Sequence, residues 1–516
     1  MRAAVACVAL AAGCQVTGTY HCMTDDQCAR GSSAGFCETS GYCSFTDSTC
    51  DTQRRYDSSA GSGLDSTCVE TIVTGYYRGR FVVNDAAFMP SVVELPPAPT
   101  AVVNVTLDDG TQPKLHLAAD GHFVFDIAHA GQAYRVFADG TEYQLAAPHL
   151  DIGVIVAGRA DRVPVTMPTQ LLITLTGNIS GNDGIASTGL WTVFDTGTNN
   201  SSFGLDWRMV SSVSGALGLL DASKHDRLYV TKRVTTNGVT SLVGYGTADV
   251  TLADGMNMAI MNVAIAHTTD DCRQLTAPLA DHAARLAMTV PGATPEWSWA
   301  ILAAAAPDQM GLNAVQTLAS TASPTAPANI DAPQMLGNPF PGTTLVADTV
   351  VALSYPFAMT GISGPNLFAT SASASTFAAG ATCAEQKSSL DATVAIAGEV
   401  SVGGTAITAD DQAVTVDPTK TTQVTWKLAV PGTAGAFRIT MFEVTNDGTN
   451  ASLNATHTFF TVAPQLALAP GLLASGHTYI FEIVTSLSPL AAGGDFMTHV
   501  LPLASTSTYS HSFAVQ

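Results

Sequence analysis

The sequence predicts an all-β protein, built as several β-sandwich domains in tandem after a small disulfide-rich N-terminal module. Three observations support this fold class. Runs that alternate apolar and polar residues recur from residue 71 onward, and 102–107 is a clear example. Asp-Gly pairs and other glycine turns separate these runs, as at Asp109-Gly110. Six cysteines fall between residues 22 and 68, a density typical of disulfide-stabilised modules.

Length and charge restrict the domain count and the partners. The chain has 516 residues, which at about 150 residues per domain favours roughly three or four domains. Acidic residues number 42 against 21 lysines and arginines, a net charge of −21. This excess argues against nucleic acid as a partner, because phosphate binding needs clustered cations. No apolar run reaches the roughly 18 residues of a membrane-spanning helix, so we expect no helical transmembrane span.

Residues 1–13 are organised like a signal peptide. Arg2 gives a positive start, 3–12 are apolar, and small residues precede Cys14. This end of the segment resembles the lipobox of bacterial lipoproteins, where a peptidase cleaves before a cysteine that carries acyl chains. The resemblance implies lipidation of Cys14, and Gln15 in place of Asp implies the outer membrane of a Gram-negative cell. Simple secretion and a cytosolic chain with an apolar start are the alternatives.

Residues 14–70 hold too few large apolar side chains for a core, so covalent bridges must supply the stability. The segment has no C-x2-C pair of the kind that zinc modules use, which favours three disulfides and leaves their pairing open. The string from Gly41 to Asp47, followed by Cys50, resembles the Cys-rich module at the amino end of exported lipoproteins of myxobacteria-like Gram-negative bacteria. The predicted disulfide cysteines are Cys22, Cys28, Cys37, Cys43, Cys50 and Cys68.

Two more cysteines, Cys272 and Cys383, lie in the middle of the chain. A disulfide between two strands fits the exported compartment, and free thiols are the alternative. The third interpretation is zinc, since His, Asp and Cys are zinc ligands. Its candidates are His267, Asp270, Asp271, Cys272, Asp281 and His282. We predict no metal and no cofactor.

Residues 71–162 predict a first small β-sandwich. The order of a strand, then Asp120-Gly121 followed by Phe123 and Phe125, then a short loop and a Tyr-x-Val strand from Tyr134, resembles the carboxypeptidase-regulatory-like sandwich. Residues 163–388 predict a β-rich middle domain, with strands at 171–175 and 228–234. Helical turns are expected only at 278–287 and 307–318.

Residues 389–516 predict a C-terminal sandwich. Trp426 lies in the alternating run 423–431, and Leu473, Gly476 and Tyr479 precede Ile483. These features resemble the second strand and the Leu-x-x-Gly-x-x-Tyr-x-x-x-Val stretch of fibronectin type III domains. In such sandwiches the corner tyrosine bonds back to the backbone. The resemblance therefore implies structural roles for Trp426 and Tyr479.

The sequence contains no G-x-S-x-G elbow, no H-E-x-x-H helix, no phosphate loop and no dinucleotide fingerprint. We therefore predict no catalytic residues. Trp297 and Trp299 are two residues apart, so a strand would place both rings on one face. Such a pair would form a sugar-binding platform, or else lie in a sandwich core or between domains.

Together these features predict an exported outer-membrane lipoprotein that faces the periplasm or the cell surface. We expect a non-enzymatic adhesion, ligand-binding or structural protein whose partners are the membrane, through the lipid anchor, and a glycan or protein ligand. The alternative is a secreted hydrolase of glycan or protein, with its catalytic part in 163–388 and the fibronectin-like domain as an accessory.

Overall fold

The computed structural model describes residues 20–516 apart from short internal stretches. These stretches are 32, 39–40, 51–53, 62–63, 70, 97–102, 128–131, 139, 178–179, 188–192, 196, 198–199, 214–217, 269–270, 291, 306–314, 324–327, 341, 358–365, 378–386, 390–392, 447–450, 488–490, 499–500 and 502. The described chain is nearly all β, with two α-helices, α1 (Trp207–Val213) and α2 (Leu279–Ala287). The predicted all-β fold class is confirmed. No helix of the described residues is long and apolar enough to cross a membrane.

The N-terminal module is made of short elements around three disulfides. Its turn of 3-10 helix (Asp25–Gln27) precedes β1 (Ala29–Arg30), β2 (Ser33–Ala34), β3 (Phe36–Cys37), β4 (Cys43–Thr46) and β5 (Arg54–Tyr56). A small core of Tyr42, Tyr56, Ala60 and Val69 also includes Ile72 from the strand that follows. The module is therefore packed against the next unit as well as joined to it by the chain.

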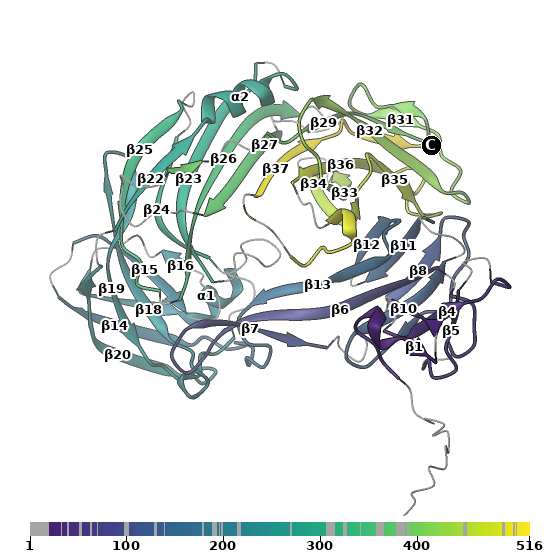
Figure 1. The fold of residues 1–516 in the computed structure, drawn as a ribbon. Helices are drawn as coiled ribbons and strands as arrows, with labels where there is room; N and C mark the ends of the chain where they lie inside the picture. Colours follow the sequence, from purple (N-terminus) through teal and green to yellow (C-terminus); the bar gives the residue numbers. More distant parts are fainter. Residues whose placement is uncertain are drawn as a thin grey trace, which may run out of the picture.

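The first sandwich has two facing sheets (Figure 1). One contains β6 (Thr71–Asn84), β7 (Pro90–Leu95), β9 (His116–Leu117), β10 (His122–Ile127) and β13 (His149–Ala157). The other contains β8 (Val103–Leu107), β11 (Tyr134–Ala138) and β12 (Thr141–Leu145). Burial alternates along β8 and β10, which is why the sequence pattern located them.

Besides contributing Ile72 to the core of the N-terminal module, strand β6 is long enough to contribute to the cores of two further units. Its Val73 and Tyr77 lie in the core of the first sandwich, whereas Val82 belongs to the core of the middle unit. Ala157, at the end of the parallel neighbour β13, joins that second core as well. In Figure 1 the two strands extend across the bottom of the molecule from one unit to the other.

The middle unit surrounds the largest core, in which Trp207 and Phe340 are fully buried. Helix α2 was predicted, but the predicted helical turns at 307–318 are wrong where the chain is described. Residues from Val315 form a strand, because this segment pairs with β23 and, at Ala319 and Ser320, also with β19. The strands are β14 (Gln170–Thr176), β15 (Asn182–Ser187), β16 (Val193–Asp195), β17 (Ser202–Asp206), β18 (Leu228–Thr236), β19 (Val239–Ala248), β20 (Asn257–Ala264), β21 (Ala266–His267), β22 (Asp271–Ala277), β23 (Thr294–Ala304), β24 (Val315–Ser323), β25 (Ile330–Leu336), β26 (Thr344–Phe357), β27 (Asn366–Phe377) and β28 (Lys387–Ser389).

The C-terminal unit is a fibronectin type III-like sandwich. One sheet has the order β30 (Thr405–Ala406), β29 (Ile396–Val402), β32 (Thr422–Val430) and β35 (Gln465–Leu468). The facing sheet pairs β34 (Ala451–Thr461), β33 (Ala436–Asn446), β36 (Thr478–Ser486) and β37 (Leu503–Tyr509), with β31 (Gln412–Val414) and β38 (Phe513–Val515) at its end.

The residues that carried the fibronectin-like prediction lie where the fold requires them. Trp426 is 4% exposed and packs edge-on to Phe437, with ring centroids 5.2 Å apart. The Tyr479 hydroxyl accepts a hydrogen bond from the Ala474 backbone N–H at 3.1 Å, which is the tyrosine corner.

The units form one ring of paired strands (Figure 1). β27 of the middle unit pairs with β37 of the C-terminal sandwich, and β34 of that sandwich pairs in parallel with β12 of the first sandwich. The register joins Thr141 to Thr458 and Gln144 to Thr461. The end of the chain therefore returns to its beginning.

Replacing Trp426 with Ala should lower the free energy of unfolding by about 3–5 kcal/mol, because it leaves a cavity in the C-terminal core. Tyr479→Phe should cost about 1 kcal/mol, the net value of one hydrogen bond. Chemical denaturation of the two full-length variants measures both. Equal stability of Trp426→Ala and the wild type would contradict the fibronectin-like core.

Candidate functional site

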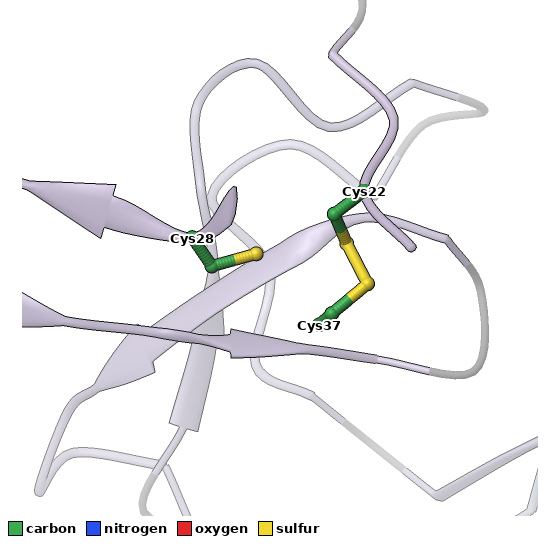
Figure 2. Close-up of side chains that lie close together, drawn as sticks. All are labelled: Cys22, Cys28 and Cys37. Atoms are coloured by element: carbon green, nitrogen blue, oxygen red, sulfur yellow. A yellow bond between two sulfur atoms is a disulfide. The ribbon is translucent and has the colours of Figure 1, made fainter. Parts of the chain in front are cut away.

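The six N-terminal cysteines form three disulfides. Cys22 pairs with Cys37, Cys28 with Cys43 and Cys50 with Cys68, with Cα–Cα distances of 5.8, 5.3 and 5.4 Å. Figure 2 shows the Cys22–Cys37 bridge with the sulfur of Cys28 turned toward it. Cys22, Cys28 and Cys37 have their sulfur atoms within 4.8 Å of one another, the spacing of a metal site. All three sulfurs are in disulfides, so none is a thiolate that could bind a metal.

Three other predicted cysteine sites are only partly within the described chain. Cys14 and Cys383 lie outside the described residues. Cys272 lies on β22 and is disulfide-bonded, which excludes the free-thiol and zinc interpretations for this residue.

The tryptophan pair lies on β23, and its two rings share one face of the strand as predicted from their spacing. That face is the core: Trp299 is 3% exposed, and Trp297 packs against the same cluster. A sugar-binding platform of two exposed rings is therefore wrong, because large aromatic side chains are more stable when they fill the sheet's buried side. The core interpretation holds instead.

The structure reveals clefts between units that the sequence did not indicate, and two of them are lined by both histidine and carboxylate side chains. The larger, which we call the histidine cleft, has a volume of about 550 Å³ and lies between the N-terminal module and the first sandwich. Its rim carries three exposed histidines, and its floor includes buried Tyr42 and Phe123. The histidines are His21, His116 and His122. Within the described chain they do not form a metal-spaced group with one another.

The second, which we call the tyrosine cleft, has a volume of about 270 Å³ and lies between the middle and C-terminal units. The middle unit contributes Thr289 after α2, Tyr355 at the end of β26 and Thr370 on β27. The C-terminal unit contributes lining residues from β29, from the loop around Asp410 and from the end of β37. These residues include Glu399, Thr508, Tyr509, Ser510 and His511.

The tyrosine cleft contains a histidine–carboxylate pair. His511 Nδ1 is 2.8 Å from Asp410 Oδ1, and that oxygen also accepts from the Ser512 backbone N–H at 3.3 Å. The neighbouring hydroxyls are used elsewhere: Ser510 Oγ donates to the His511 carbonyl and accepts from the Phe481 N–H. Among the residues that the structure describes, no serine is therefore held against this imidazole as a nucleophile would be.

Both tyrosines of this cleft remain neutral phenols at physiological pH. Burial raises the pKa of Tyr355 to about 12, helped by the negative charge of Asp410. Burial also raises the pKa of Tyr509 to about 12, and the Glu482 carboxylate, 3.4 Å from its hydroxyl, acts in the same direction. Their hydroxyl groups can therefore donate or accept a hydrogen bond.

Sequence reasoning missed both clefts for one physical reason. The residues that meet in the tyrosine cleft come from segments as far apart as Thr289 and His511, and no local pattern marks such a meeting. One weak signal was present: the Asp410-Asp411 and His511-Ser512 pairs are polar residues that directly precede short strands.

No protein-family model and no curated protein matches the chain. Among solved structures, the chicken CNTN1 FN1-FN3 domains align at 7% identity over 85% of this chain and 99% of that chain, with a TM-score of 0.13. A mutant of Salmonella alpha-2-macroglobulin aligns at 10% identity over 88% and 30%, with a TM-score of 0.09. A putative adhesin from Bacteroides ovatus aligns at 9% identity over 43% and 75%, with a TM-score of 0.08. Scores this low carry no argument, so function must be inferred from the chain's own geometry.

Alkylation of the unreduced protein should leave all six N-terminal cysteines unmodified, because each is oxidised. Peptide mapping by mass spectrometry should recover the pairs Cys22–Cys37, Cys28–Cys43 and Cys50–Cys68. Reduced protein, in which all six thiols react, is the control. Six reactive thiols before reduction would contradict both the bridges and an oxidising compartment.

Proposed function

We propose that the protein is a non-enzymatic, exported surface protein that binds a ligand in a cleft where its units meet. The observation that carries this is the tyrosine cleft, whose histidine–carboxylate pair has no activated hydroxyl beside it. Its other polar groups are hydroxyls and carboxylates that can hydrogen-bond to a ligand. A site of this kind orients a ligand without breaking a bond.

An oxidising location supports the export part of the proposal. Three disulfides in a module of about fifty residues persist only outside the reducing cytosol. We further propose that acyl chains on Cys14 hold the protein to the outer membrane. Burial of methylene groups would supply the affinity at about 0.8 kcal/mol each. The net charge of −21 would add no attraction to anionic lipid.

Incubation of the purified full-length protein with polysaccharides and peptides should yield complexes and no new chain ends. Light scattering or calorimetry measures binding, and chromatography of the products detects cleavage. Turnover of any substrate would overturn the non-enzymatic proposal and favour the hydrolase alternative.

Metabolic labelling with a fatty acid should tag the wild type, because Cys14 is the proposed acylated residue. Cys14→Ser should remain unlabelled and leave the membrane fraction. Cys7→Ser is the matched control and should be labelled like the wild type, since it lies within the proposed signal peptide. Equal labelling of Cys14→Ser and wild type would contradict the lipid anchor.

A further inference from the structure

The tyrosine cleft is small and is formed by strands and loops from two units. Its volume of about 270 Å³ lies just below the range of about 300–1,000 Å³ that is usual for small-molecule sites. Because β27 and β37 are hydrogen-bonded neighbours, the two sides of the cleft are fixed relative to each other. The site therefore has room for a single ring and not for an extended chain.

A bulge in β29 places Glu399 at the cleft, with its side chain 65% exposed. The register of β29 against β32 shifts between Gly398 and Ser401, and Glu399 adopts a positive φ of 48° there. Non-glycine residues rarely adopt this conformation, and such strained positions cluster at functional sites. Glu399 contacts Lys427 through Oε2 at the surface.

The cleft has an excess of hydrogen-bond acceptors. Asp410 uses Oδ1 for His511 and Ser512, and its Oδ2 has no partner among the described residues. Glu399 Oε1 likewise has none. No lysine or arginine is among the described residues that line the cleft. An anionic ligand is therefore disfavoured, and the ligand must bring hydrogen-bond donors.

Aromatic and hydroxyl groups complete the lining. Tyr355 and Tyr509 pack against the buried pair Val444 and Ile480, which holds both rings in place. Thr289, Thr508 and Ser510 add hydroxyls around them. A ring that has polar edges and an apolar face matches this combination, because carboxylates accept from its hydroxyls while aromatic rings cover its C–H face.

We propose that the tyrosine cleft binds a single neutral hexose unit, whose hydroxyls donate to Asp410 and Glu399 and whose ring packs against Tyr355 and Tyr509. This inference rests on the proposed binding function and names the ligand class of that site.

Isothermal titration calorimetry of the full-length protein tests it with glucose, galactose, glucuronate and butylammonium as probes. At least one of the two neutral hexoses should bind, whereas glucuronate should not, because its carboxylate would meet Asp410 and Glu399. Asp410→Asn and Tyr355→Ala should each weaken hexose binding by about tenfold, because the first removes the charge of an acceptor and the second removes a ring that packs against the sugar. Thermal unfolding shows that each variant is folded.

Glu443→Gln is the matched control, since Glu443 pairs with His477 at 2.7 Å on the same sandwich but outside the cleft. Its hexose affinity should equal that of the wild type. Butylammonium binding as strong as hexose binding would overturn the proposal in favour of recognition of a cation. Absence of hexose binding, or unchanged affinity in Asp410→Asn, would also overturn it. If both cleft variants still bind a polysaccharide, only the assignment of this site is refuted. If the protein cleaves the polysaccharide, the proposed function is refuted.

Discussion

The parallel pairing of β12 with β34 is the contact on which the arrangement of the units depends. Each strand would otherwise be the exposed edge of its own sheet, with a row of unpaired backbone groups. Gln144 reinforces the pairing, because its side-chain amide donates to the Ala467 carbonyl and accepts from the Ala467 N–H at 2.7 and 2.9 Å. Tyr143 stacks on Phe460, with ring centroids 5.3 Å apart. The two strand edges thus satisfy each other's backbone hydrogen bonds, although they lie more than 300 residues apart in the sequence.

A second contact joins the first and C-terminal sandwiches through the sheet that contains β6 and β13. The segment after β36 returns to β13: the Asp151 N–H donates to the Gly494 carbonyl, and the Phe496 N–H donates to the Asp151 carbonyl. Gly494 has a φ of +92°, and a Cβ there would lie 1.7 Å from the His149 carbonyl oxygen, so only glycine fits. Arg80 adds a bond to the Met497 carbonyl at 3.0 Å. With the ring closed at this point, the positions of the clefts between units are fixed by the fold.

The sequence predicted what local patterns encode. Alternation located strands such as β8 and β10, and the spacing of Trp426 and Tyr479 identified the last sandwich, because these features depend on neighbours a few residues away. Cysteine density predicted the bridges but could not pair them. Local patterns could not predict the clefts or the β12–β34 junction. In the sequence, Gly493-Gly494 resembles an ordinary turn. No residue near Gln144 indicates that its side chain bonds to Ala467. The face of Trp299 was ambiguous because alternation does not say which side of a sheet is buried.

Hydrogen exchange of the backbone amides of β12 and β34 in the full-length protein tests the closed ring most directly. Amides paired across the junction should exchange as slowly as those in the β33–β34 hairpin, because both belong to one continuous sheet. Exchange of the β12 and β34 edges at the rate of exposed loops, with the β33–β34 hairpin still protected, would contradict it. The units would then be independent sandwiches on a string.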